Sequence, residues 1–392
     1  MNDRKASIAM VAYTNYATDP RVIREAEAMV SAGYPIDFYA LKREGDPKVE
    51  SINGVRVIHL NMKRYRGNSN VRYMLSYLEF LFRCLILFSV RPRRYKVIHV
   101  NNMPDFMIFV GFFPKIFGAK LVLDIHDPMP TTFESKFEEG KGWKYRLLLW
   151  QERLSASFAN KVITVHQPMK DEILVAHGIP EQKITVIANF ADEKKFPLRE
   201  NYKPEGDKIK ILFHGTIAER FGLQNVIKTL MQNKYRSRYT LKIIGEGDYS
   251  DSLKEFIAVN NAGDVVDFEN RFYSVDKLSV IIGGFDVGLV SYILSSGTQH
   301  MLPLKMMEYI SVGLPVLTIR NSPIGYYFTE EDCFYYDPEK PETLNHWFNA
   351  FIEDKDLLDH GRNHVLTIRN RFLWNNEKRK YITLLENLIN NE

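Results

Sequence analysis

The sequence lacks the features that would assign it to a secreted or disulfide-stabilised class. Only two of its 392 residues are cysteines, Cys84 and Cys333, too few for a disulfide framework. The first residues also lack the basic, apolar and small-residue succession of a secretory signal. We therefore expect a protein of the reducing cytoplasm that folds around hydrophobic cores.

Motifs for resident metals, cofactors and covalent catalysis are missing as well. The chain has no D-x-D triplet, no HExxH and no paired CxxC, and no serine, cysteine or histidine arrangement indicates a covalent intermediate. Gly245 and Gly247 in IIGEGD form half of a phosphate loop, but the third glycine of a dinucleotide fingerprint is absent. We expect no metal and no cofactor, and oxidoreductase is the last of the functions considered.

Length and apolar patterning predict two doubly wound α/β domains. A chain of 392 residues, 45% hydrophobic and 26% charged, exceeds what one core usually serves. Apolar runs of strand length, such as Ile36–Leu41, Val55–Leu60, Ile209–His214 and Tyr239–Ile244, alternate with predicted helices such as Phe106–Phe117. This alternation is typical of parallel sheets covered on both faces. The polar stretch before Ile209 reads as a linker. We predict Rossmann-like domains over 1–195 and 209–375, a linker over 196–208, and a C-terminal helix over 376–392 that could cross back to the first domain.

The net charge of +4 is unevenly distributed. Between Asn61 and Lys96 nine basic residues face one acid, Glu79, so this segment carries +8 and the rest of the chain −4. Inside it lies an aromatic and aliphatic helix, Tyr73 to Val90, interrupted by Glu79 and Arg83, which argue against a spanning helix. The basic residues considered for membrane contact are Arg64, Arg66, Arg72, Arg83, Arg91, Arg93 and Arg94.

Two interpretations of this segment remain open. A helix packed on a parallel sheet can be very apolar for structural reasons alone. Alternatively, its exposed edge enters the headgroup region of an anionic leaflet, where each arginine contributes about 1 kcal/mol. We favour peripheral contact with the inner face of the plasma membrane. Nucleic acid is not expected, because the aromatics belong to a continuous apolar helix and do not alternate with exposed basic residues.

The segment LPLKMMEYISVGLPVL, from Leu302 to Leu317, is the most informative in the chain. Pro303 precedes a predicted helix, Gly313 ends it, and a buried strand follows. A carboxylate at Glu308 can accept hydrogen bonds from the two neighbouring hydroxyls of a ribose, while Lys305 and the amides of the first turn can meet phosphate charge. On spacing alone, the same pair also suits an ordinary solvated helix face.

The chain as a whole resembles the retaining glycosyltransferases of family 4, which have the GT-B fold. The resemblance rests on YTNYATDPRVIREAEAMVSAGYPIDFYAL, HVNNMPDFMIFVGFFPKIFGAKLVLDIHDPMP, FHGTIAERFGL, LKIIGEGD, FDVGLV, LPLKMMEYISVGLPVL and FLWNNEKRKY, which follow in the family's order. The front and middle segments are similar to a subgroup that builds bacterial polysaccharides. The resemblance to the family implies two Rossmann-like domains that face an interdomain cleft.

The resemblance implies a donor site in the second domain. Glu308 corresponds to the second glutamate of the family's E-x7-E motif, which grips the ribose, whereas His300 replaces the first glutamate. Gln299 and His300 are candidates for contact with the donor hexose, with a plain surface loop as the alternative. The remaining residues assigned to this site are Arg220, Lys305, Gly215 and Thr216.

Arg220 and Lys305 are the candidates for the diphosphate. Arg220 lies where the family has a basic residue, and a cation at a helix start is disfavoured by the macrodipole unless it serves another purpose. Thr216 replaces the second basic residue of the family, so Lys305 is expected to supply the missing charge for the leaving group.

In the first domain the resemblance points to His126 as the catalytic residue near the acceptor. His126 follows a strand, where ligands bind in such sheets, but hydrogen bonding to Asp124 or Asp127 is an alternative. The first loop carries Asn15 and Arg21, which could approach the acceptor or phosphate. Asp19 is expected to cap the helix that follows.

We therefore expect a metal-independent hexosyltransferase that uses a UDP- or GDP-linked sugar and retains the anomeric configuration. The expected acceptor is a lipid-linked saccharide in cell-surface polysaccharide synthesis. Two alternatives stay open: a sugar-nucleotide epimerase or hydrolase of the same fold, and a nucleotide-sugar-binding protein without activity.

Overall fold

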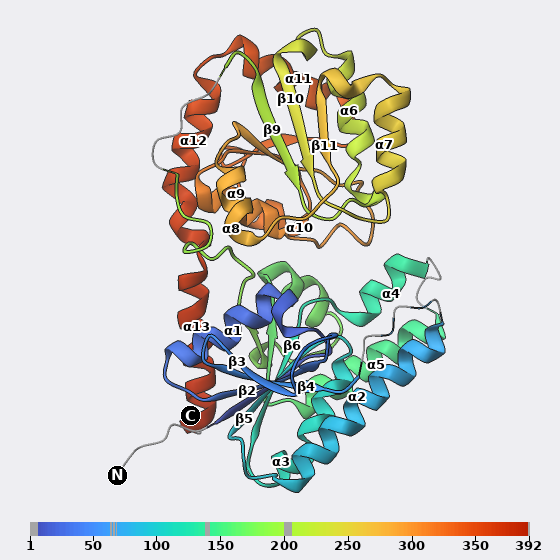
Figure 1. Cartoon of the computed structure of the whole chain (residues 1–392), viewed down its shortest axis with the longest axis vertical. Helices are drawn as coiled ribbons and strands as arrows, with labels where there is room; N and C mark the ends of the chain where they lie inside the picture. Colours follow the sequence, from blue (N-terminus) through green and yellow to red (C-terminus); the bar gives the residue numbers. More distant parts are fainter. Residues whose placement is uncertain are drawn as a thin grey trace. The chain divides into compact units, whose positions relative to one another are not determined.

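The computed structural model describes residues 7–62, 65, 67, 69–137, 142–199 and 206–390, and it divides into two compact units. Unit 1 comprises Met1–Asn189 with Glu377–Glu392, and unit 2 comprises Phe190–Asn376. Each unit holds one sheet with helices around it (Figure 1). The predicted pair of doubly wound parallel sheets is confirmed. Of the predicted linker, residues 200–205 lie outside the described residues.

Unit 1 is built on an eight-stranded sheet in the order β3-β4-β2-β1-β5-β6-β7-β8. All neighbours are parallel except β3 and β4, which form an antiparallel pair at the edge. The strands are β1 (Ile8–Val11), β2 (Ile36–Leu41), β3 (Val49–Ile52), β4 (Val55–Leu60), β5 (Val97–Asn101), β6 (Lys120–Ile125), β7 (Lys161–Thr164) and β8 (Ile184–Val186).

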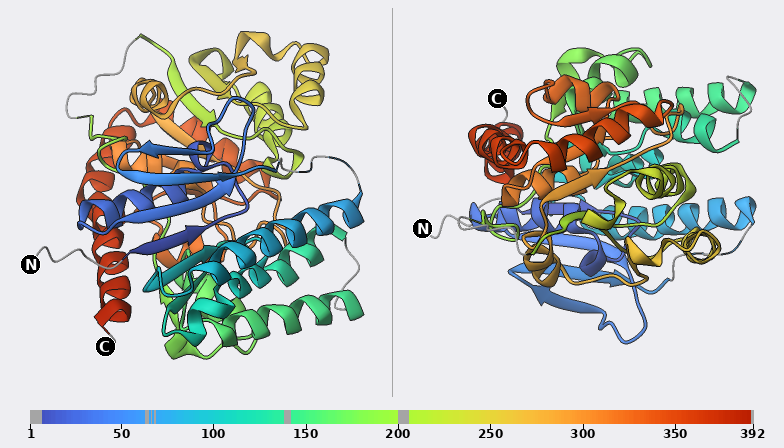
Figure 2. Two further views of the ribbon diagram at one scale, coloured as in Figure 1. Left: turned by 60° about the horizontal axis from the view of Figure 1, so that its bottom comes forward. Right: turned by 90° about the horizontal axis from the view of Figure 1, so that it is seen from above.

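Helices cover both faces of this sheet (Figures 1 and 2). On one face lie α1 (Pro20–Ser31) and the C-terminal α13 (Trp374–Asn390). On the other lie α2 (Asn70–Val90), the 3₁₀ segment η2 (Asp105–Gly111), α3 (Phe112–Ile116) and α5 (Trp143–Phe158). The segment η2 packs against both α2 and α5. The remaining elements are η1 (Tyr16–Thr18), α4 (Met129–Phe137), the π-helical turn η3 (Met169–Leu174) and η4 (Glu181–Lys183).

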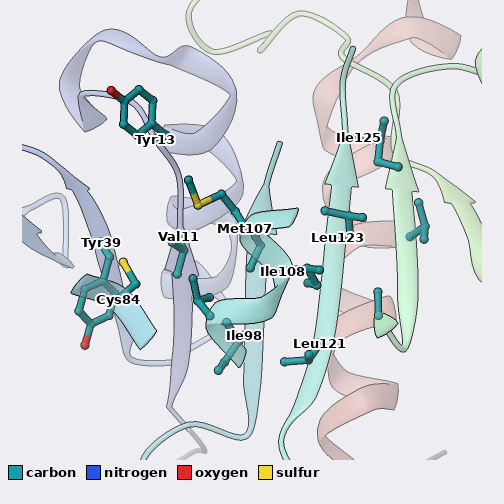
Figure 3. Close-up of a cluster of buried hydrophobic side chains, with 14 of the residues drawn as sticks. Val11, Tyr13, Tyr39, Cys84, Ile98, Met107, Ile108, Leu121, Leu123 and Ile125 are labelled. Carbon is teal, nitrogen blue, oxygen red and sulfur yellow. The ribbon is translucent and has the colours of Figure 1, made fainter. Parts of the chain in front are cut away.

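Helix α2 has one face in the core and one face exposed. Its side chains Tyr77, Phe80, Cys84 and Phe88 pack in the apolar cluster beneath it, together with residues of the central strands (Figure 3). By length and composition Val71–Val90 could cross a membrane. Its most apolar stretch of 18 residues has a mean hydropathy of 1.6, and 22% of that stretch is buried inside the protein. The buried face ties α2 to the sheet, since leaving it would expose the core.

Unit 2 is built on a six-stranded parallel sheet in the order β11-β10-β9-β12-β13-β14. Figure 1 shows α6 and α7 beside one face of it and α8 and α9 beside the other. The strands are β9 (Ile209–His214), β10 (Tyr239–Ile244), β11 (Val266–Glu269), β12 (Val287–Val290), β13 (Val316–Ile319) and β14 (Phe334–Tyr336). The helical segments are η5 (Glu219–Phe221), α6 (Leu223–Gln232), η6 (Arg236–Arg238), α7 (Ser250–Val259), η7 (Ala262–Asp264), α8 (Val275–Ile282), α9 (Leu304–Val312), α10 (Ser322–Tyr327), α11 (Pro341–Glu353), α12 (Leu357–Ile368) and η8 (Arg369–Phe372).

One expected local contact is not formed. Asp19 occupies the N-cap position of α1, as predicted, but its side chain accepts no capping hydrogen bond. Pro20 takes the first helical position, where its missing N–H removes one of the groups that a cap would satisfy. The expectation of an aspartate cap was therefore wrong.

Candidate functional site

The start of α9 lies against the carboxyl end of β9, since Nζ of Lys305 contacts the ring of Phe213. Pro303 precedes the helix, and Gly313 ends it in the left-handed conformation with φ 84°. Lys305 and Glu308 are both buried although both are ionisable. A solvated helix face, the alternative for this pair, is therefore excluded.

The side-chain amine of Lys305 is buried at the centre of this region. Within the described part of the chain, its Nζ makes no hydrogen bond. It lies 3.4 Å from the ring centroid of Phe213 and 4.5 Å from that of Phe221. Burial lowers the pKa of Lys305 well below its usual value, the charge of Arg220 adds to this, and Glu308 opposes it. An anion that reached Nζ would supply the missing acceptor and favour the charged amine.

Gly215, directly after β9, leaves open the space beside this ammonium. Its φ is +112°, and a Cβ there would sit 3.6 Å from both Cε and Nζ of Lys305. Every other residue would therefore strain the backbone and occupy the approach to the amine. The arrangement of an open glycine and a buried cation suits a phosphate oxygen.

Glu308 lies on the same helix, next to the histidine that ends β9. Its Oε2 is 3.3 Å from Nε2 of His214, whose ring also meets Tyr309 edge to face. Burial, together with the nearby Lys305 ammonium, lowers the pKa of His214 to about 3, so the ring is neutral near pH 7. A neutral imidazole adds no positive charge beside Glu308, whose carboxylate oxygens are of the kind that accept hydrogen bonds from ribose hydroxyls.

Two further glycines let the neighbouring loop approach β9 closely. A Cβ on Gly245 would lie 1.7 Å from the carbonyl oxygen of Gly215, and one on Gly247 would lie 2.0 Å from that of Ile217. The amide of Ile217 donates to the carbonyl of Glu246 at 3.0 Å. These glycines thus serve close backbone packing at the site.

The other predicted donor residues surround the region at the surface. Arg220 is exposed on η5, over the ring of Phe221, and Thr216 is exposed beside Gly215. Gln299 is exposed and His300 half-buried in the loop before α9. The amide of Asn321 fixes that loop by donating to the carbonyls of Thr298 and Met301 at 2.9 and 2.8 Å. Their contact with a hexose stays a prediction.

In unit 1 the carboxylate of Asp124 binds two of the three site residues predicted in that domain, His126 and Arg21. Nε2 of His126 donates to Oδ2 of Asp124 at 2.7 Å. Arg21 donates to both carboxylate oxygens, at 2.7 Å to Oδ1 and 3.1 Å to Oδ2. Arg21 is buried and also pairs with Glu25 at 3.3 Å, so its guanidinium is engaged within the fold. Asn15 is half-buried at the start of η1.

The network extends from Asp124 to the C-terminal helix. His99 lies with Nε2 3.7 Å from Asp124, and its Nδ1 is hydrogen-bonded to the hydroxyl of Tyr381 on α13 at 2.7 Å. Although burial opposes it, the charges of Arg21 and His126 hold the pKa of Asp124 well below its usual value. Burial and the Asp124 carboxylate raise the pKa of Glu25 well above its usual value. Asp124 is thus the ionised member of this pair of acids.

Glu25, His99 and Asp124 also have the composition of a metal site, with ligand atoms within 4.8 Å of one another. The residues do not fit one, because the guanidinium of Arg21 already binds both carboxylates. A second positive charge at this distance from Arg21 would be repelled in a buried environment.

The arginines considered for membrane contact are found in different environments. Arg83 pairs with Glu79 at 2.6 Å on the exposed side of α2, and Arg94 pairs with Asp37. Arg93 lies over the ring of Phe117 at 4.4 Å. Arg72 and Arg91 are exposed, and Arg64 and Arg66 lie outside the described residues. The charge of Arg94 is therefore compensated within the protein.

Sequence reasoning missed several residues of these two sites. Phe213 and Phe221 form the aromatic surroundings of Lys305, and the spacing of FHGTIAERF gives no sign of it. Tyr381 is separated from His99 by 282 positions, so no local pattern could pair them. The His126–Asp124 contact was foreseeable, because residues two apart at a strand end share one face.

Two family models match the chain. The model described as "Glycosyl transferase 4-like domain" matches residues 18–189, and that described as "Glycosyl transferases group 1" matches residues 194–364. The first match lies in unit 1 and the second in unit 2, and together they cover more than half of the chain.

Individual proteins are similar at low identity. The chain is 22% identical over 354 residues to the chitobiosyldiphosphodolichol beta-mannosyltransferase of Debaryomyces hansenii, over 83% of this chain and 74% of that one. It is 30% identical over 158 residues to the amylovoran biosynthesis glycosyltransferase AmsK of Erwinia amylovora, over 38% of this chain and 37% of the relative. The structure of Anabaena HepE in complex with UDP superposes with a TM-score of 0.73 at 14% identity, over 97% of this chain and 99% of that one.

Proposed function

The chain belongs to the family 4 glycosyltransferases of the GT-B fold, which transfer a sugar from a nucleotide sugar, and from that premise we propose the following reaction. A hexose moves from a UDP- or GDP-linked donor to a hydroxyl of a lipid-linked saccharide, with retention of anomeric configuration. The observation that carries this proposal is the buried Lys305 amine beside Gly215, which has no hydrogen-bond partner among the described residues and lies on the same helix as Glu308.

The charged and polar candidates of the donor site are assigned to different parts of the donor. Glu308 accepts hydrogen bonds from the two ribose hydroxyls, and Lys305 donates to the diphosphate. Arg220 at the rim adds positive charge, and Gln299 and His300 contact the hexose. As the bond to the anomeric carbon breaks, negative charge grows on the leaving diphosphate, and preorganised cations stabilise it at that moment. Charged side chains and helix α9 neutralise the diphosphate in this scheme, which uses no metal.

His126 is proposed to act in the sugar transfer, with its ring oriented by a hydrogen bond to Asp124. The 2.7 Å hydrogen bond from Nε2 fixes the ring and leaves Nδ1 for a substrate hydroxyl. The leaving phosphate itself is proposed to take the acceptor's proton.

The proposals for the acceptor and for the cellular localisation rest on different observations. One relative is named for a diphosphodolichol-linked saccharide and another for amylovoran biosynthesis, which favours a lipid-linked acceptor in polysaccharide synthesis. On α2, exposed apolar residues recur on the side facing solvent, at Val71, Leu75, Phe82, Ile86 and Val90, and the exposed ion pair of Glu79 with Arg83 lies between them. Trp143, Leu147, Trp150 and Leu154 form a second exposed stripe on α5. We propose that these stripes, with Arg72 and Arg91, enter an anionic membrane surface on its cytoplasmic side.

A thermal-shift panel of UDP, GDP and their sugars tests donor binding. A ligand at one hundred times its dissociation constant stabilises the protein by about 2.7 kcal/mol. Glu308→Ala should abolish the shift, whereas the exposed control Glu255→Ala on α7 should retain it. His126→Ala should also retain the shift but lose transfer. An unchanged shift in Glu308→Ala would refute the ribose contact, and release of free sugar without an acceptor would indicate a hydrolase.

Vesicle flotation tests the membrane contact separately. Wild-type protein should float with phosphatidylglycerol vesicles and less with phosphatidylcholine. Phe82→Ser with Ile86→Ser should weaken flotation, while Val280→Ser, an equally exposed apolar position in unit 2, should not. Equal flotation of all three proteins would contradict the proposed surface.

A further inference from the structure

Unit 1 holds a groove between the exposed flank of α2 and the ends of β2 and β4. It measures about 590 Å³ and lies in the size range of small-molecule sites. Its apolar wall comes from Ile86 and Leu87 of α2 and from Ile58 and Leu60 of β4. Lys42, Lys48 and Arg83 line it as well, and none of the described residues that line it is acidic.

The positive charge of this groove belongs mainly to its two lysines. Arg83 is already engaged with Glu79 through two hydrogen bonds at 2.6 and 2.9 Å. The ring of His59 is hydrogen-bonded to the carboxylate of Glu50, at 2.7 Å from Nε2. Lys42 and Lys48 take part in no ion pair within the described ranges of the chain. An apolar wall with two unpaired ammonium groups matches a ligand that joins an anionic headgroup to a hydrocarbon chain.

The groove adjoins the exposed apolar stripe proposed to contact the membrane, and it lies at the same edge of the sheet as His126. Ile86 belongs both to the groove and to the exposed apolar stripe of α2. Lys42 follows β2, and His126 follows β6 at the same carboxyl edge of the sheet. The strand order places β2 three strands from β6, or roughly 14 Å at the usual strand spacing.

We propose that this groove binds a phosphorylated lipid, with the phosphate on Lys42 and Lys48 and the chain along Ile86 and Leu87. The inference deepens the proposed function, on which it rests for its link to catalysis, because it assigns a site to the lipid part of the acceptor. A prenyl phosphate and a membrane phospholipid share this chemistry. The spacing to His126 leaves room for a saccharide between the phosphate and that edge.

Titration of the full-length protein with soluble probes tests the groove without a membrane. The probes are a ten-carbon prenyl phosphate, dihexanoyl phosphatidylglycerol below its micelle concentration, the phosphatidylcholine of equal chain length, and inorganic phosphate. The prenyl phosphate should bind more tightly than phosphatidylcholine and than inorganic phosphate. Equal binding of prenyl phosphate and phosphatidylglycerol would assign the groove to anionic lipids in general, and tighter prenyl phosphate binding would assign it to the carrier lipid.

Matched variants decide whether the groove is responsible. Lys42→Glu with Lys48→Glu should weaken prenyl phosphate binding about 10- to 100-fold, less than two buried charge-assisted contacts would contribute, because Lys48 is exposed and solvent screens its charge. Lys120→Glu, at the amino end of β6, is the charge control and should bind normally. Leu87→Gln should weaken binding, whereas Leu75→Gln on the same helix outside the groove should not.

The UDP-induced thermal shift separates this proposal from the donor site. All four variants should keep that shift, since the groove lies in unit 1 and the donor site in unit 2. Unchanged prenyl phosphate binding in the double lysine variant, or equal binding of phosphatidylcholine, would overturn the groove proposal even if UDP binds. Lipid binding through the groove in a protein that shows no shift with any nucleotide would refute the proposed donor instead.

Discussion

Lys305→Met should make the ligand-free protein more stable and its nucleotide binding weaker. Methionine has a similar length and no polar atom, so it fills the space over Phe213 without an unsatisfied donor. Removing a buried unsatisfied group should stabilise unit 2 by about 1 to 3 kcal/mol. For a unit of this size each kcal/mol corresponds to roughly 2–4 °C in melting temperature.

The same change should remove one charge-assisted hydrogen bond to the diphosphate. Such bonds contribute about 1.5–3 kcal/mol, so UDP affinity should fall roughly 10- to 150-fold. Thermal unfolding with and without UDP measures both effects in one experiment. Lys277→Met, at an exposed position on α8, is the control and should change neither quantity appreciably.

The pH dependence gives a second measure of the same residue. Because the pKa of folded Lys305 lies well below the unfolded value of 10.5, the unfolded chain binds the extra proton. This contribution to stability is complete above 10.5 and is lost as the pH falls through the folded pKa. Lys305→Met should lack that slope. A lower melting temperature with an unchanged UDP shift would refute the anion-binding role and make Lys305 a structural residue.

Two other changes test the buried histidines. His214 has a folded pKa of about 3 against 6.5 unfolded, so its contribution is complete above 6.5 and about 2 kcal/mol is lost by pH 5. Urea unfolding at pH 7.5 and 5 should show this loss in the wild type and a smaller one in His214→Gln; equal losses would contradict a buried neutral imidazole. Tyr381→Phe leaves a nitrogen of His99 without its partner and should destabilise unit 1 by about 1–3 kcal/mol. If the network positions His126, kcat should fall while the UDP-induced shift persists; an unchanged kcat would make Tyr381 purely structural.

Most of the sheet architecture could be predicted because buried parallel strands are continuous apolar runs. The ranges Ile36–Leu41, Val55–Leu60, Ile209–His214 and Tyr239–Ile244 were predicted with the boundaries observed. Strands β3 and β14 were missed because they are short edge strands, and β3 is largely exposed, so neither gives a long apolar run. Helices α4 and α10 were also missed.

Helix geometry was harder to predict than helix position. The expected helix over Phe106–Phe117 is divided into η2 and α3, with the junction at Gly111. Pro114 has no N–H for a continuous ladder, and it is accommodated by a helix that begins anew at Phe112. Gly111 also lets this segment approach Leu121, where a Cβ would lie 2.4 Å from the nearest side-chain atom.

The candidate donor residues of unit 2 could be chosen from the sequence because they lie in short motifs, and their part in donor binding stays a prediction. Glu308, Lys305 and Gly215 come from two segments that parallel strands bring to one edge of the sheet. The sequence could not show that Lys305 is buried among Phe213 and Phe221, nor that Arg21 is engaged with Asp124. These partners are far apart in the sequence, by 103 positions for Arg21 and Asp124, and their contacts depend on packing.

The return of the last helix to unit 1 sets an order for folding during synthesis. Unit 2 is one uninterrupted stretch, so it can form as soon as Asn376 has left the ribosome. Unit 1 lacks Tyr381 and Leu385, both fully buried, until the final residues emerge. The first half of the chain must therefore wait, incomplete and with apolar surface exposed, for the second half to be made, and a nascent chain stalled before Glu377 would present that surface to chaperones.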